Sequence, residues 1–129
     1  MAKPKTRGGI FHVEDAFRYS MQGIRGAFKK EESFRLEIFV YSPFIPLAFF
    51  VGSTLSHTAL LIVAVLFVFG IELLNSAMEA AVDLACDEVH PLAGFAKDAG
   101  TAASFMFQAS FAIVWVAALA EKFIPLLFG

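Results

Sequence analysis

Carboxylates occur inside an otherwise apolar stretch of this chain, and they recur at helical spacing. At about 100° per residue, the polar members of this stretch fall on one helix face, within roughly 100° of arc. An ionised carboxylate that faces lipid costs several kcal/mol, so these side chains must face other helices, water, a metal or a substrate. The members of this polar stripe are Glu72, Asn75, Ser76, Glu79 and Asp83.

A polar contact that holds helices together is the simplest alternative for the stripe, because Asn and Ser often form such contacts. It explains Asn75 and Ser76, but three like charges on one face repel one another unless cations balance them. Lys97 is the only Lys or Arg between Arg35 and Lys122. A divalent metal is the natural further counter-charge, and Mg²⁺ bound by carboxylates and a phosphate fits the pattern. The stripe therefore predicts a functional site.

Lys97 belongs to a second polar cluster, residues 87–98. Its ammonium offers three donors to a phosphate, although for this lysine taken by itself an anchor of the helix at the membrane surface is the better explanation. The three histidines show no zinc-site spacing. No Gly-Lys dipeptide occurs, so a P-loop is excluded, and protein-kinase signatures are also absent. No basic and aromatic stripe favours nucleic-acid binding.

The composition places these groups in a membrane. The chain has 129 residues, of which 58% are hydrophobic and 17% charged, and its mean hydropathy is +0.70. A soluble domain of this size could not bury so much apolar surface. One cysteine and 5 prolines exclude a disulfide scaffold and collagen. We therefore expect one all-α membrane domain that spans residues 1–129.

The longest uncharged run predicts two membrane crossings. It covers Ile38 to Ile71 and would be about 51 Å long as one helix, against a hydrocarbon core of roughly 30 Å. It should turn back at residues 52–56, where small and hydroxyl residues favour a turn and a helix cap. We expect transmembrane helices over about 33–51, 56–86 and 92–122, the first kinked by Pro43 and Pro46.

The charges predict the orientation of these helices. Eight of the ten Lys and Arg residues precede residue 38, which places the N-terminus in the cytoplasm and the C-terminus in the periplasm. A mixed polar segment separates the first basic residues from the first apolar run, so we expect no cleaved signal peptide. Apolar residues also recur over about 9–29 at spacings of three and four. This pattern predicts an amphipathic helix on the cytoplasmic membrane surface, in preference to a helix packed on a soluble partner domain.

The motifs that carry this chemistry resemble those of the small integral-membrane diacylglycerol kinases of bacteria. The family pattern E-x-x-N-[ST]-A-x-E-x-x-x-D matches residues 72–83, and its A-K-D matches residues 96–98. Glu31 and the segment 33–37 are similar to the family's entry into its first span. The similarity extends over nearly the whole chain, and the run 97–101 is more similar to the diacylglycerol branch than to undecaprenol kinases.

The resemblance implies a homotrimer in the cell inner membrane, with active sites shared between subunits. Each subunit would have one surface helix and three transmembrane helices, and would transfer phosphate from ATP to diacylglycerol with Mg²⁺. It implies that Glu72 is the general base, that Glu31 and Glu79 hold the metal, and that Asn75 and Asp83 support the site. The nucleotide residues would be His12, Tyr19, Glu31, Glu79, Glu88, His90, Lys97 and Asp98. The lipid residues would be Arg25, Ser33, Arg35, Glu37, Glu72 and Thr101.

Two other interpretations remain open from the sequence. An undecaprenol kinase of the same fold would keep the catalytic residues and change the lipid. A non-enzymatic membrane oligomer, such as a cation pore lined by the carboxylates, would have no use for Lys97, whereas a kinase needs it. These interpretations differ in what they predict for substitution of that lysine.

Overall fold

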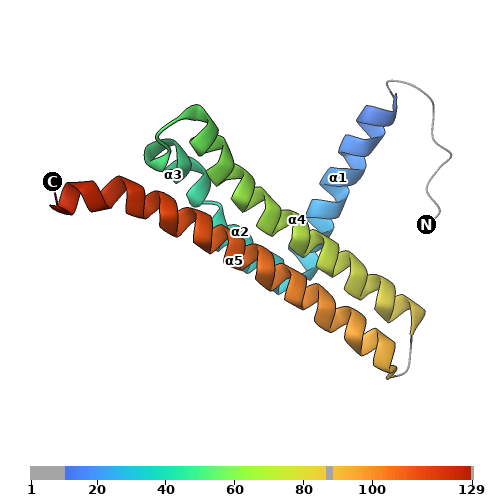
Figure 1. Ribbon diagram of the computed structural model, residues 1–129. Coiled ribbons are helices and arrows are strands. Elements are labelled where there is room, and N and C mark those ends of the chain that lie inside the picture. The colour runs from blue at the N-terminus through green and yellow to red at the C-terminus, as the bar shows by residue number, and fades with distance from the viewer. Residues whose placement is uncertain (1–10, 87–88, 129) are drawn as a thin grey trace.

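The computed structural model describes residues 11–86 and 89–128, and within these ranges the chain forms helices without strands. The helices are α1 (Phe11–Lys30), α2 (Glu32–Tyr41), α3 (Phe44–Val51), α4 (Leu55–Ala85) and α5 (Pro91–Phe128). Figure 1 shows α4 and α5 side by side along the length of the molecule, with α2 and α3 against them and α1 projecting from this bundle. Three segments are long and apolar enough to cross a membrane, namely α2 with α3, α4, and α5 up to Pro125.

The first of these segments is two helices, whereas the sequence predicted a single kinked one. The helix α2 ends at Tyr41, and the N–H of Ser42 still donates to the carbonyl of Ile38. Pro43 follows, and it has no N–H with which to continue the ladder. Pro46 is the third residue of α3, where a missing N–H costs little because the first turn leaves its donors unpaired in any case. The break therefore lies at Pro43 alone.

A tight turn joins α3 to α4. Thr54 caps α4 by accepting a hydrogen bond from the N–H of His57 at 3.1 Å. A Cβ on Gly52 would overlap the hydroxyl of Thr58, so the chain passes too close to α4 for any other residue. The predicted turn is confirmed at residues 52–54, whereas residues 55 and 56 of the predicted turn already belong to α4.

The hydrophobic core lies at the end of the bundle near this turn, between α3, α4 and α5 (Figure 1). Trp115 is 2% exposed, and its indole N–H donates to the carbonyl of Leu61 at 3.3 Å. The ring of Phe44 packs edge-on against Trp115 at 4.8 Å and against Phe111 at 5.0 Å. These contacts fix the three helices at one end and leave the polar side chains of α4 toward the other.

Large apolar side chains also cover the outside of the bundle. Phe39, Phe49 and Ile113 are each about 70% exposed, which suits helices surrounded by lipid. The helix α5 continues to Phe128, beyond the end predicted near residue 122, and it passes through Pro125. Arg35 joins α1 to α2, since its guanidinium donates to the carbonyls of Phe28 and Lys29 at the end of α1.

Candidate active site

Six of the predicted site residues line one cavity of about 370 Å³ between α2, α4 and α5. The helix α4 contributes three polar side chains at i, i+3 and i+7, which the helical period places on one face. Residues from the start of α2 and from α5 close the cavity. The predicted residues that line it are Ser33, Glu37, Glu72, Asn75, Glu79 and Thr101.

Glu72 is the most buried carboxylate of this cavity, with 6% of its surface exposed. The hydroxyl of Ser104, equally buried, donates to Glu72 Oε2 at 3.1 Å. Because this contact holds one carboxylate oxygen, the side chain is fixed in direction while its second oxygen remains to accept a proton. This is the arrangement that a general base needs before a substrate hydroxyl arrives.

Asn75 and Glu79 form the next contact along α4. The amide nitrogen of Asn75 donates to Glu79 Oε1 at 3.0 Å, while Asn75 Oδ1 is buried without a hydrogen-bond partner. A buried carbonyl oxygen without a donor is costly, so it indicates a group that the bound state supplies. Gly100 of α5 packs directly over this amide, and a Cβ there would overlap Asn75 Oδ1 and the methyl of Met78.

We expect Gly100→Ala to misplace Asn75 without unfolding the bundle, because both overlapping atoms end side chains that can rotate away. Rotation of the amide removes its bond to Glu79, and a misplacement of about 1 Å in a site of this kind costs up to 10²-fold in rate. The steady-state rate of the reaction catalysed at this site should fall about 10- to 100-fold. Gly94→Ala is the matched control, since a Cβ at Gly94 meets nothing within 4 Å. Equal rates in both variants would contradict the role of Asn75.

Three further lining residues, Ser104, Phe105 and Gln108, were missed by the sequence analysis. Gln108 donates from Nε2 to Glu37 Oε1 at 2.7 Å and so joins α5 to α2. A signal for them existed, because Thr101, Ser104 and Gln108 are polar residues at i, i+3 and i+7 in the uncharged stretch 99–120. The same spacing on α4 was recognised as a polar face because two of its three residues, Glu72 and Glu79, are charged.

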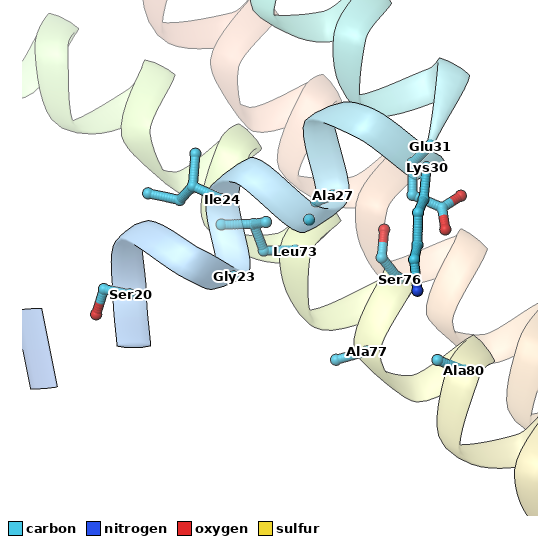
Figure 2. Close-up of a pocket in the computed structure, with 11 residues that line it drawn as sticks. Ser20, Gly23, Ile24, Ala27, Lys30, Glu31, Leu73, Ser76, Ala77 and Ala80 are labelled. Carbon is cyan, nitrogen blue, oxygen red and sulfur yellow. The ribbon is translucent and has the colours of Figure 1, made fainter. Parts of the chain in front are cut away.

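A second pocket of about 480 Å³ lies on another side of α4, against α1. Figure 2 shows Lys30 at the end of α1, and Glu31 directly after it, close to Ser76 of α4, with mostly small or apolar side chains of both helices along the remainder. Ser76, at the edge of the predicted polar face, thus faces α1. Glu31 lines this second pocket and Glu79 lines the first, so the chain by itself does not bring the two predicted metal ligands into one cavity.

The donor set of the first cavity suits a hard cation. Glu79 offers a carboxylate and Asn75 an unpartnered carbonyl oxygen beside it. Mg²⁺ is commonly held by one or two protein oxygens, with waters and substrate phosphates completing its shell. Across residues 11–86 and 89–128, no three His, Cys, Asp or Glu side chains gather into a metal-binding cluster. The residues present therefore fit a cation shared with a phosphate.

Lys97 and Asp83 form an ion pair between α5 and α4, near the ends of these helices that the 86–90 connection joins. Both side chains are substantially exposed, at 42% and 66%. Exposed pairs of this kind contribute little to stability. The pair instead holds an ammonium group near the carboxylates of α4, where an incoming phosphate could meet it.

The remaining predicted residues lie outside the cavity. His12, Arg25 and Asp98 are exposed, Tyr19 is half-buried beside Arg18, and His90 Nδ1 accepts from the N–H of Leu92 at the start of α5. The guanidinium of Arg35 donates hydrogen bonds to the carbonyls of Phe28 and Lys29 in α1. Glu88 lies outside the described residues. The structure does not test the predicted ligand contacts of these residues.

Comparison with known proteins identifies the family to which a chain with this cavity belongs. The family model for prokaryotic diacylglycerol kinase matches residues 18–119, which include every residue of the first cavity. The chain belongs to the prokaryotic diacylglycerol kinase family. This membership confirms the family and the activity class that the motifs predicted.

Diacylglycerol kinases from several bacteria are similar along most of their length. The protein of that name from Haemophilus influenzae is 45% identical over 107 residues, covering 83% of this chain and 91% of the relative. The one from Pseudomonas aeruginosa is 36% identical, and the one from Escherichia coli K12 is 35% identical. Each of these two alignments covers 89% of this chain and 94% of the relative. The similarity to these relatives therefore extends over most of the chain, including the helices that form the cavity.

Proposed function

We propose that this protein transfers the γ-phosphate of ATP to diacylglycerol and forms phosphatidic acid at the cytoplasmic face of the inner membrane. The observation that carries the proposal is Glu72, a carboxylate buried in a membrane-spanning helix, held by Ser104 and lining a cavity shared with Glu79. A buried acid at this depth can meet a lipid hydroxyl, while Glu79, about two helical turns along α4, is within reach of a nucleotide.

In the transfer step, the oxygen of the lipid hydroxyl attacks the γ-phosphorus, and Glu72 accepts the proton of that hydroxyl. A new phosphorus–oxygen bond forms, the bond to the bridging oxygen of ATP breaks, and ADP leaves with the electron pair. Glu72 then releases its proton to solvent. Phosphoryl transfer needs mainly positioning and charge neutralisation, and the cavity supplies positioning through Ser104 and Asn75.

Glu79, with Asn75 Oδ1 beside it, would hold the magnesium ion together with the nucleotide phosphates. The ion, when bound, neutralises the phosphate charge that builds up during transfer. The ammonium of Lys97 reaches the same phosphates on its flexible stem, and Asp83 keeps it near α4 before they arrive. The other nucleotide contacts proposed are those of Tyr19, His90 and Asp98, with His12 and Glu88.

Assembly into a homotrimer with shared active sites completes this proposal. In one subunit Glu31 lines the α1–α4 pocket and Glu79 the neighbouring cavity. A neighbouring subunit that packs on α4 would bring its own groups to these half-open pockets. The exposed aromatic side chains of Phe67, Phe105 and Phe107 provide an apolar surface for such a contact.

The helix α1 lies on the cytoplasmic surface of the membrane in this proposal. Val13 and Phe17 are 73% and 67% exposed, so their apolar side chains need lipid rather than the rest of the chain. Arg25 and Arg35 are then near phospholipid headgroups and the acceptor lipid. The basic residues before the first span set the N-terminus on the cytoplasmic side.

The decisive experiment is phosphate transfer from labelled ATP by the purified protein in mixed micelles, with diacylglycerol and undecaprenol offered side by side. We expect label in the diacylglycerol product only when Mg²⁺ is present, and loss of transfer when the ion is chelated. Preferential labelling of undecaprenol would replace the substrate in this proposal. Folded protein that labels neither lipid would contradict the kinase assignment and favour the pore or scaffold interpretation.

A further inference from the structure

A polar pair, Glu37 of α2 and Gln108 of α5, lies in the wall of the active-site cavity. Gln108 Nε2 donates to Glu37 Oε1 at 2.7 Å, and both residues line the cavity. Gln108 lies one helical turn beyond Ser104, about 6 Å farther along α5 from the residue that holds the base. An amide and a carboxylate at this depth of a membrane-spanning helix are costly unless they have a use.

The carboxylate of Glu37 decides how the amide of Gln108 is turned. A carboxylate oxygen accepts hydrogen bonds, so the amide must present its nitrogen to Glu37 and not its oxygen. That nitrogen carries two hydrogens, and Glu37 Oε1 takes one of them. The second N–H remains as a hydrogen-bond donor of fixed direction in the wall of the cavity.

The pair is also incomplete as an internal contact. Glu37 Oε2 is buried and has no hydrogen-bond partner. Buried polar atoms are almost always paired in folded proteins. Glu37 Oε2 only accepts hydrogen bonds, so a hydroxyl or a water molecule suits it, and this wall is polar rather than fitted to hydrocarbon alone.

The proposed acceptor supplies a group that matches the free donor. In diacylglycerol, an ester is attached to the glycerol carbon adjacent to the one that bears the reacting hydroxyl, and its carbonyl oxygen is a hydrogen-bond acceptor. With the hydroxyl at Glu72, this carbonyl is a few ångströms away, which is the separation along α5 between Ser104 and Gln108. A prenyl or ether lipid has the hydroxyl without the carbonyl.

We propose that Gln108 donates a hydrogen bond to an ester carbonyl of the acceptor lipid and makes the site prefer ester-bearing glycerols over ester-free alcohols. Glu37 acts through it as a positioning residue that fixes the amide. This inference rests on the proposed kinase function and adds a specificity-determining residue that the motifs do not contain.

The test compares diacylglycerol with a dialkylglycerol of equal chain length, which keeps the hydroxyl and the two chains but lacks both carbonyls. We expect the wild-type enzyme to favour the diacyl lipid roughly tenfold in kcat/KM, the effect of about one good hydrogen bond. In Gln108→Met, which keeps the length of the side chain, this ratio should fall to near one. The KM for MgATP should stay as in the wild type, and the rate with dialkylglycerol should fall much less than the rate with diacylglycerol.

Two further variants separate this role from a structural one. Gln108→Asn draws the amide back from Glu37 and should also lose the preference, so the test stands even where the Met variant does not fold. Glu37→Gln leaves the direction of the amide undetermined and should reduce the ratio with unchanged KM for MgATP. Ser110→Ala is the control, because the hydroxyl of Ser110 donates to the carbonyl of Met106 in its own helix and does not line the cavity.

The outcomes are distinct. Equal losses with both lipids, or a Gln108 variant that keeps the wild-type preference, would overturn the inference while leaving the kinase assignment in place. A wild-type enzyme that phosphorylates both lipids equally would do the same. A wild-type protein that phosphorylates neither lipid would overturn the proposed function together with this inference.

Discussion

Glu72→Gln is expected to lower kcat for diacylglycerol phosphorylation about 10²- to 10⁴-fold, the usual range for loss of a general base. The amide keeps the size of the side chain and can still accept the hydrogen bond from Ser104, which is 3.1 Å from Glu72 Oε2 in the wild type. It cannot take a proton from the lipid hydroxyl. The oligomeric state and the binding of MgATP should therefore be retained while turnover is lost.

The measurement is steady-state transfer from labelled ATP, with nucleotide binding and oligomeric state determined on the same preparation. Glu121→Gln is the matched control, since Glu121 is an exposed carboxylate near the opposite end of α5. Its turnover should equal that of the wild type. Normal turnover in the Glu72 variant would exclude this residue as the base.

Lys97→Ala is expected to lower kcat/KM about 10²- to 10³-fold, as is typical when one group that stabilises transition-state charge is removed. The fold should persist, because the ion pair with Asp83 is exposed and contributes little stability. Activity and thermal unfolding measured side by side check both statements. The same variant separates the two classes of function, because a cation pore would gain from loss of the ammonium.

Lys122→Ala is the control for this experiment. The ammonium of Lys122 donates to the carbonyl of Phe50 at 2.6 Å and lies 4.6 Å from the centre of its ring, near the turn between α3 and α4. Its loss should weaken that end of the bundle without changing phosphate transfer. Full kinase activity in the Lys97 variant, or cation flux through proteoliposomes that this substitution leaves intact, would contradict the assigned role.

The sequence by itself determined the class of the protein and the chemical character of its site. Carboxylates in a long apolar run cost too much to face lipid, so their spacing predicted an inward polar face without knowledge of its partners. Glu72 and Glu79 are seven residues apart, and a regular helix places them on the same face. Both indeed line one cavity. The turn over residues 52–56 was equally predictable, because a helix of the full uncharged length exceeds the membrane.

The tertiary structure decided what lies across from that face. Helical periodicity fixes directions within one helix but not the rotation or depth of its neighbours. Ser104 and Gln108 became site residues only because α5 packs with that side toward α4 and α2. Likewise, Glu31 faces a different pocket from Glu79 because α1 approaches another side of α4 (Figure 2). Such placements depend on contacts between residues far apart in the chain, which local spacing does not encode.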